Sequence, residues 1–422
     1  MNPQSLGRNI RVGIIGAGAM GKGLFYQCHI TPGFECVALA DIRLERAVAC
    51  AQWLKRDHCV VDDLEAMNRA SSSGQLAICR DGHLLVLCDS VDVVIEASSA
   101  IALAGEFAVY ALAERKHLVL MNAEIDLIYG PYLLELAQRS GVTYTSCDGD
   151  QHGVIKRLVD DLRLWGFQLV MAGNIKGFLD RYSNPKKIVP EADKRNLDYK
   201  MATAFTDGTK LNIEMALVAN ALGLRVHKPG MHGPKAGNVR EVFQLFDFEL
   251  LWKDRRPFVD YILGAEPGGG VFAIGFCDND YQRQMLDYYK MGKGPFYLFY
   301  RPYHLCHIEA MSSVADAVLQ RKALIQPKAG FRTNVYAYAK RDLKRGERLD
   351  GIGGYACYGL IENCAGPEGN SGLPICLADD IVLLREIHKD GKISISDVGY
   401  DQTRKDFELY AKALKVSRRN RA

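Results

Sequence analysis

The chain has 422 residues, of which 48% are hydrophobic and 24% charged, and a formal net charge of only +3. This composition is typical of a soluble globular protein and excludes disordered, fibrous and collagen-like classes. The basic residues are scattered, which argues against a nucleic-acid partner, and the length predicts about three domains.

The twelve cysteines show neither a Cys-x-x-Cys pair nor the spacing of zinc ligands. Most lie in apolar runs, which predicts reduced core thiols and a cytoplasmic location. The first residues lack the apolar run of a signal peptide, and no apolar stretch approaches the roughly 20 residues of a membrane span. His304 and His307 are three apart without a third ligand nearby. We therefore expect no membrane partner and no metal site.

The first predicted element is a buried strand, "NIRVGII", followed by a glycine turn and a helix. Gly16, Gly18 and Gly21 fit the spacing G-x-G-x-x-G of a dinucleotide-binding turn. The first glycine permits a tight turn, the second lets a pyrophosphate approach, and the third lets the helix pack on the strand. The pyrophosphate would lie at the helix N-terminus beside Ala19 and Met20, where free N–H groups favour an anion.

A second predicted strand ends at Asp41, about 20 residues after the last glycine, where a carboxylate can hold the ribose hydroxyls of a dinucleotide. This context disfavours the alternative, a glycine-rich turn without a ligand. Asp41 favours NAD, whereas Arg43 could meet the 2′-phosphate of NADP. The expected cofactor is therefore NAD(P)H, with the choice between the two open.

Strands over residues 91–99, 117–125 and 142–147 alternate with helices over 103–116 and 130–141. This alternation predicts an α/β fold, a Rossmann-type, doubly wound parallel sheet. Ligands of such sheets lie beyond the carboxyl ends of the strands, so Ser98, Asn122 and Glu124 are expected on the nicotinamide side. The alternative is that they are ordinary turn and cap residues.

Residues 151–330 lose this alternation and are expected to form a central α+β substrate, catalytic and dimerisation domain. The segment "FTDGTKLNIEMALVANALGL" predicts a helix capped by Thr206 or Asp207, with Lys210 and Glu214 on one face near its first turn. One interpretation is a cap with an exposed ion pair. The other is a substrate site in which Lys210 donates a proton or anchors an anion and Asp207 and Glu214 orient it.

Weaker candidates lie in two loops and are more typical of solvated charges: Lys186, Lys187, His232 and Lys235. From about residue 331, short strands and glycine turns predict a compact β-rich unit. Three domains are thus expected, over residues 1–150, 151–330 and 331–422.

The segment "AKRDLKRGERLDGIGGYACYGLIEN" resembles the SAF (antifreeze-like, β-clip) domain. With "VGIIGAGAMGKGL", "LMNAEID", "SCDGDQHGV" and "FTDGTKLNIEMALVANALGL", it makes the chain similar to SAF-domain oxidoreductases that have a homoserine-dehydrogenase-like N-terminal region. One branch of this group is the deoxyxylulose-phosphate-reductoisomerase-like enzymes. The resemblance implies an NAD(P)H-dependent oxidoreductase, a homodimer or larger, with its active site between the dinucleotide and central domains.

We therefore expect hydride transfer between NAD(P)H and a carbonyl or hydroxyl carbon of a small polyol, sugar or sugar phosphate, with or without a coupled isomerisation. A semialdehyde reductase like homoserine dehydrogenase is the first alternative. Those enzymes carry a Lys directly after the asparagine that corresponds to Asn122, whereas this chain has Ala123 there. Reductoisomerases hold a metal with clustered carboxylates, and no such cluster stands out here. A non-catalytic dinucleotide-binding sensor or scaffold is the second alternative.

Overall fold

A computed structural model of the chain describes residues 7–194, 197–364, 372–401 and 403–419. Contacts between residues divide the chain into two compact units, each built from separate stretches. Of the described residues, unit 1 takes 7–150, 305–326 and 403–419, and unit 2 takes the rest. The division into three domains stays a prediction.

Unit 1 contains a seven-stranded sheet of order β3-β4-β2-β1-β5-β6-β7 in which every pairing is parallel. The strand order reverses between β1 and β5, and in such folds ligands bind outside the carboxyl ends of the strands at this switch point. The predicted Rossmann-type fold is confirmed. The strands are β1 (Ile10–Ile15), β2 (Phe34–Ala40), β3 (His58–Val60), β4 (Leu76–Cys79), β5 (Val93–Glu96), β6 (His117–Leu120) and β7 (Tyr144–Ser146).

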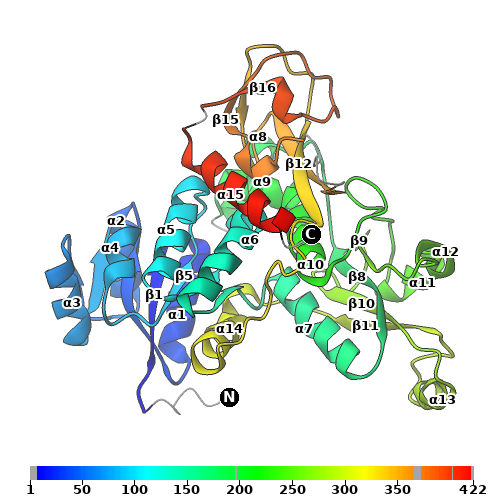
Figure 1. Cartoon of the computed structure of the whole chain (residues 1–422), viewed down its shortest axis with the longest axis horizontal. Helices are drawn as coiled ribbons and strands as arrows, with labels where there is room; N and C mark the ends of the chain where they lie inside the picture. The colour runs from blue at the N-terminus through cyan, green and yellow to red at the C-terminus, as the bar shows by residue number, and fades with distance from the viewer. Residues whose placement is uncertain (1–6, 195–196, 365–371, 402, 420–422) are drawn as a thin grey trace. The chain divides into compact units, whose positions relative to one another are not determined.

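Helices from three parts of the chain cover this sheet (Figure 1). Two of them come from distant sequence: α14 packs on α1, and α15 packs on α5 and α6. Ala310, Ser313 and Ala317 of α14 are 0% exposed, and such small residues let a helix pack closely on its neighbours. The helices of unit 1 are α1 (Ala19–Ile30), α2 (Leu44–Trp53), α3 (Leu64–Ser72), α4 (Gly82–Leu87), α5 (Ala102–Ala113), α6 (Ala123–Ser140), α14 (Cys306–Gln320) and α15 (Lys405–Arg419).

Helix α6 corrects the predicted strand over residues 117–125 and the predicted helix start at 130. The strand ends at Leu120, and α6 begins at Ala123, where the Asn122 Oδ1 accepts a hydrogen bond from the backbone N–H of Ile125 at 3.4 Å. The helix continues through Pro131. Its first two turns are buried on all sides, and a helix of this kind gives the same apolar run as a buried strand.

Unit 2 contains a four-stranded sheet of order β11-β10-β8-β9, in which β8 and β9 are parallel and the other pairs antiparallel. Helix α7 packs on β8 and β10, and α10 contacts α7 and β9. The strands are β8 (Gln168–Lys176), β9 (Phe258–Leu263), β10 (Val271–Phe276) and β11 (Phe296–Arg301). The helices are α7 (Gln151–Leu164), α8 (Pro185–Lys194), α9 (Tyr199–Thr206), α10 (Thr209–Leu222), α11 (Val242–Leu245), α12 (Phe248–Leu251) and α13 (Asp280–Tyr288).

The C-terminal part of unit 2 is β-rich, as predicted, with two small sheets, β12-β14 and β13-β15-β16. Helix α10 packs against β12 and β14. The backbone N–H groups of Gly359 and Ile361 on β14 donate to Thr209 Oγ1 and Asn212 Oδ1 of this helix, each at 2.9 Å. The resemblance of this part to a SAF domain stays a prediction. Its strands are β12 (Thr333–Ala339), β13 (Arg348–Asp350), β14 (Cys357–Asn363), β15 (Asp379–Leu383) and β16 (Val398–Gly399).

Nine of the twelve cysteines are buried, in agreement with the predicted core thiols. Burial raises the pKa of Cys36, Cys79 and Cys357 to about 12, so these thiols stay neutral at physiological pH. Within the described residues, no helix combines the length and apolar character needed to cross a membrane.

Candidate active site

Close backbone contacts shape the glycine turn after β1. Gly16 has a φ of +99°, and a Cβ there would lie 2.8 Å from backbone atoms of Ala97 and Ser98. A Cβ on Gly21 would lie 1.7 Å from the carbonyl oxygen of Gly16. Because neither position has room for a side chain, the packing of the turn requires both glycines.

Gly18 differs from its two neighbours in the motif, because a Cβ there would meet no atom within 4 Å. It is the N-cap of α1, and no side chain caps this helix end. Ala19 is exposed and Met20 partly exposed. The first turn of α1 therefore offers N–H groups without a side-chain cap beside open space, an arrangement that suits a phosphate group.

Asp41 follows β2 and links that strand to the glycine turn. Its Oδ2 accepts a hydrogen bond from the Ala17 backbone N–H at 2.7 Å, and its Oδ1 accepts one from the Arg43 backbone N–H at 2.8 Å. The Arg43 side chain is exposed at the start of α2. The carboxylate can accept further hydrogen bonds, so its expected contact with a ribose, and that of Arg43 with a 2′-phosphate, stay predictions.

Two buried side chains hold the loop after β5. Glu96 is 0% exposed, and its Oε1 accepts hydrogen bonds from the Ser98 backbone N–H at 3.0 Å and from the Ser98 hydroxyl. Asn122 Nδ2 donates to the carbonyl oxygens of Ser98 at 3.0 Å and Ala100 at 2.8 Å. Burial raises the pKa of the Glu96 carboxyl to about 8. Ser98 and Asn122 thus shape the loop, and their approach to a nicotinamide stays a prediction.

Helix α6 adds two further buried carboxyl groups. Glu124 lies in its first turn with 6% exposure, and its negative charge contributes to the raised pKa of Glu96. Asp126 accepts hydrogen bonds from the hydroxyls of Tyr144 and Ser146, and burial raises its pKa to about 6. The cofactor role of Glu124 stays a prediction.

In unit 2, the three predicted catalytic residues lie at the start of α10. Asp207 follows α9, and its Oδ1 accepts a hydrogen bond from the Thr209 backbone N–H at 2.8 Å. The N-cap of α10 is nevertheless Gly208, so the predicted cap at Thr206 or Asp207 is wrong by one or two residues. Asp207, Lys210 and Glu214 are 4%, 6% and 4% exposed. Lys210 and Glu214, four residues apart in α10, lie on one helical face, and Asp207 precedes the helix. The interpretation as an exposed surface ion pair is therefore wrong, because both partners are buried.

Lys340, at the end of β12, is the charged partner of Asp207. Its Nζ lies 2.8 Å from Asp207 Oδ2 and donates to the carbonyl oxygens of Ser183 at 2.7 Å and Gly354 at 2.8 Å. Burial raises the pKa of Asp207, and the charge of Lys340 opposes that rise. These three partners hold the Lys340 ammonium in place beside Asp207.

Lys176, the last residue of β8, adds a third lysine. Side chains two apart on a strand share a face, so Lys176 and Asn174 lie on the same side of the sheet, together with Tyr261, which pairs with Asn174 on β9. Burial lowers the pKa of Lys176, and the charges of Glu214 and Asp207 oppose that shift. The polar side of this strand pair thus meets the polar face of α10.

Sequence analysis missed Glu96, Lys176 and Lys340. Each is a single charged residue without a spacing pattern, and Lys340 meets Asp207 only through the fold. The one available signal was a charge that interrupts an apolar run, in "VDVVIEASS" and "VMAGNIKG".

The weaker candidates from the two loops form no hydrogen bond or ion pair with the described charged residues around α10. Lys186, Lys187 and Lys235 are exposed, in agreement with the interpretation as solvated charges. His232 Nδ1 lies 2.7 Å from Oδ2 of the fully buried Asp260, which also accepts from two backbone N–H groups of the same loop. This pair fixes the loop between α10 and β9.

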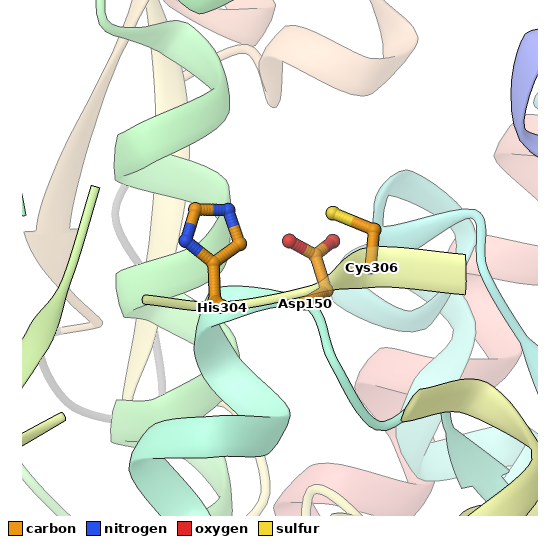
Figure 2. A group of neighbouring side chains, drawn as sticks. All are labelled: Asp150, His304 and Cys306. Atoms are coloured by element: carbon orange, nitrogen blue, oxygen red, sulfur yellow. The ribbon is translucent and has the colours of Figure 1, made fainter. Parts of the chain in front are cut away.

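Figure 2 shows the Asp150 carboxylate and the Cys306 thiol, both in unit 1, with donor atoms within 4.8 Å of each other. His304, also drawn there, belongs to unit 2. Two donors within one unit fall short of the three protein ligands of a typical metal centre. We assign no metal site to them.

Residues 149–310 match the family described as "Oxidoreductase DRL, catalytic domain". This stretch carries Lys176, Asp207, Lys210 and Glu214, whereas Lys340 lies outside it. It is less than half of the chain, and it is similar to the catalytic domain of an oxidoreductase. No curated protein matches the chain.

Among solved structures, a homoserine dehydrogenase from Thiobacillus denitrificans is 15% identical with a TM-score of 0.46, over 84% of this chain and 90% of that one. A myo-inositol dehydrogenase from Lactobacillus casei is 20% identical with a TM-score of 0.29, over 44% and 53%. A biliverdin reductase from Synechocystis sp. PCC 6803 is 17% identical with a TM-score of 0.30, over 41% and 49%. The chain spans about half the length of the last two proteins. The fold assignment rests on the strand order of unit 1 itself.

Proposed function

We propose that the chain is an NAD(P)H-dependent oxidoreductase that acts on a carbonyl or hydroxyl carbon of a small polyol, sugar or sugar phosphate. The observation that carries this proposal is a cluster of charged residues in unit 2, in which Asp207, Lys210, Glu214 and Lys340 are buried and Lys176 is partly buried. Four of its five members lie in the stretch that matches an oxidoreductase catalytic domain. Buried groups of opposite charge with shifted pKa values are typical of sites that transfer protons.

Unit 1 would bind the cofactor. The residues proposed to hold it are Gly16, Gly18, Ala19, Met20, Gly21, Asp41, Arg43, Ser98, Asn122 and Glu124. The open N-terminus of α1 would receive the pyrophosphate, and Asp41 at the end of β2 would accept hydrogen bonds from the ribose. A nicotinamide bound here would supply or accept the hydride. The exposed Arg43 keeps both NAD and NADP as candidates.

Unit 2 would bind the substrate. With every group ionised, the cluster has three ammonium groups and two carboxylates, so its net charge is positive. An anionic substrate group would balance that charge, which favours a sugar phosphate over an uncharged polyol. Lys210, at the start of α10, is the proposed anion anchor, because the helix N-terminus adds its dipole to the charge of the lysine.

Three finer properties follow from the resemblance and the composition and belong to the same proposal. They are a coupled isomerisation, assembly as a homodimer or larger, and action in the cytoplasm. The reductoisomerase branch would couple the isomerisation to hydride transfer on one substrate. Purified protein should then convert a ketose phosphate to a product with a rearranged carbon chain, which NMR of the product would detect.

The test is turnover of NADPH and NADH with a panel of sugar phosphates, polyols and homoserine. Lys210→Met should lower kcat/KM at least about a hundredfold and leave cofactor binding unchanged. Lys253→Met, at an exposed position after α12, is the matched control and should keep full activity. Full activity of Lys210→Met would remove Lys210 from the mechanism. Tight NAD(P)H binding without turnover on the whole panel would instead favour a binding protein.

A further inference from the structure

The three lysines of the cluster differ in how many partners they have. Lys340 has three close partners, Asp207 Oδ2 and the carbonyl oxygens of Ser183 and Gly354. Lys210 is almost fully enclosed, with 6% exposure, and it also has interaction partners. Lys176 is only partly buried, and within the described residues no hydrogen bond or ion pair fixes its ammonium group. Of the three, Lys176 alone is partly exposed and is held by no hydrogen bond or ion pair among the described residues.

The charges around Lys176 come from two elements. Helix α10 presents Glu214 and Asp207, which favour the protonated lysine. Asp207 is already neutralised by Lys340, so its attraction for a second cation is reduced. On β9, Tyr261 shares the face of Lys176, and burial raises its pKa, so it stays neutral and gives no charge. Burial therefore outweighs the attraction, and the pKa of Lys176 falls below its ordinary value.

A partly exposed lysine with a lowered pKa suits proton transfer. An ammonium with a lowered pKa gives up its proton more readily, and its neutral form is populated nearer to physiological pH. Lys340 and Lys210 are held by partners, whereas no hydrogen bond or ion pair among the described residues holds Lys176. The cluster thus separates into groups that hold the site and one group that can change its protonation state.

We propose that Lys176 is the catalytic residue that transfers the proton in the reaction of unit 2, with Lys210 as anion anchor and Lys340 as a positioning residue for Asp207. This inference rests on the proposed function. In the reducing direction, hydride adds to the substrate carbonyl carbon, and the electron pair of the C–O π bond moves to oxygen. That oxygen takes a proton from the Lys176 ammonium and becomes a hydroxyl, and the resulting neutral amine regains a proton from water. Oxidation follows the same steps in reverse.

The first test needs no substrate. Acetic anhydride reacts with neutral amines, so the labelling rate of each lysine, followed by peptide mass spectrometry across pH 6 to 11, reports its pKa. Lys176 should reach its half-maximal rate at a lower pH than Lys253, an exposed lysine of the same unit. Equal midpoints for the two lysines would overturn the inference and leave the proposed function standing.

The second test uses turnover with whichever panel compound the wild-type protein reduces. Lys176→Ala should lose about 10² to 10⁴ in kcat, and added propylamine should restore part of it, because a free amine can replace the missing proton donor. Lys176→Arg keeps the positive charge but gives up its proton far less readily, so it should stay inactive. A purely structural role predicts rescue by Arg and none by propylamine, and that result would overturn the inference. Failure of the wild-type protein on the whole panel would overturn the proposed function itself.

Discussion

Gly18 lies beside open space, whereas Gly16 and Gly21 have no room for a side chain. Substitutions in this turn can therefore distinguish an effect on cofactor binding from an effect on folding. Gly18→Ala adds a methyl group where no atom lies within 4 Å, at an ordinary φ of −71°, so we expect the free energy of unfolding to change by less than about 1 kcal/mol. The same methyl group would occupy the space of the proposed pyrophosphate. NADH and NADPH affinity, measured by calorimetry, should therefore fall at least about tenfold.

Gly21→Ala is the contrasting variant, because its Cβ would lie 1.7 Å from the Gly16 carbonyl oxygen. It should lower the thermal midpoint of the protein clearly, whereas Gly18→Ala should not. Normal cofactor affinity in a folded Gly18→Ala protein would contradict the assignment of this turn as the pyrophosphate site.

Glu96 predicts a pH dependence of stability. Burial raises its pKa to about 8, so between its ordinary pKa of 4.5 and pH 8 the folded protein keeps a proton that the unfolded chain releases. The contribution of Glu96 is therefore fully present below pH 4.5 and falls by about 1.4 kcal/mol per pH unit until pH 8. Glu96→Gln removes the titrating group.

The stability of Glu96→Gln relative to the wild type should therefore rise from pH 5 to pH 8, in urea unfolding curves recorded at each pH. Because other groups titrate equally in both proteins, their contributions cancel in this difference. Parallel pH profiles for the two proteins would show that the Glu96 carboxyl titrates normally.

At the scale of single residues, the sequence predicted what depends on near neighbours in the chain. The glycine turn is local, so its spacing alone identified it. Lys340 pairs with Asp207, and Lys176 lies in the field of Glu214 and Asp207, so both depend on residues of other elements that are distant in the sequence. No spacing rule marks a single lysine at the end of a strand.

At the scale of elements, α10 anchors the C-terminal strands of unit 2. Asn212, 4% exposed, accepts the hydrogen bond of the Ile361 backbone N–H at 2.9 Å. Asn212→Ala would leave that N–H buried without an acceptor, at a cost of about 1–3 kcal/mol. Hydrogen exchange of the β14 amides should accelerate accordingly. The exposed Gln244→Ala on α11 serves as the control and should leave this exchange unchanged.

The way an element is buried determines whether the sequence could predict it. Strands and helices with one buried face have a clear period, and the alternation in unit 1 was therefore correct. Helix α6 was misassigned at its start because its first two turns are buried on all sides and show no period. Helix α10 is joined to β14 by hydrogen bonds from backbone N–H groups to side-chain oxygens, and a hydrophobic pattern does not predict such bonds.

At the scale of the whole molecule, the order of segments along the chain differs from their grouping in space. The helices α14 and α15 follow unit 2 residues in the sequence yet belong to unit 1. Apolar periodicity predicts that such a helix has a buried face, but not which unit covers it. A prediction that follows the order of the sequence therefore assigns α14 and α15 to the segments next to them in the chain.

The return of α15 predicts a specific effect on unit 1. Leu409 is 1% exposed, and its Cδ1 would lie 3.0 Å from a Cβ added at Gly105, so it packs closely against α5. Leu409→Ala should cost about 2–4 kcal/mol through the cavity it leaves. Because that cost falls on unit 1, calorimetry should show a lower midpoint that bound NAD(P)H partly restores. The exposed Lys415→Ala on the same helix should change neither, and an unchanged midpoint in Leu409→Ala would mean that α15 does not stabilise the cofactor-binding unit.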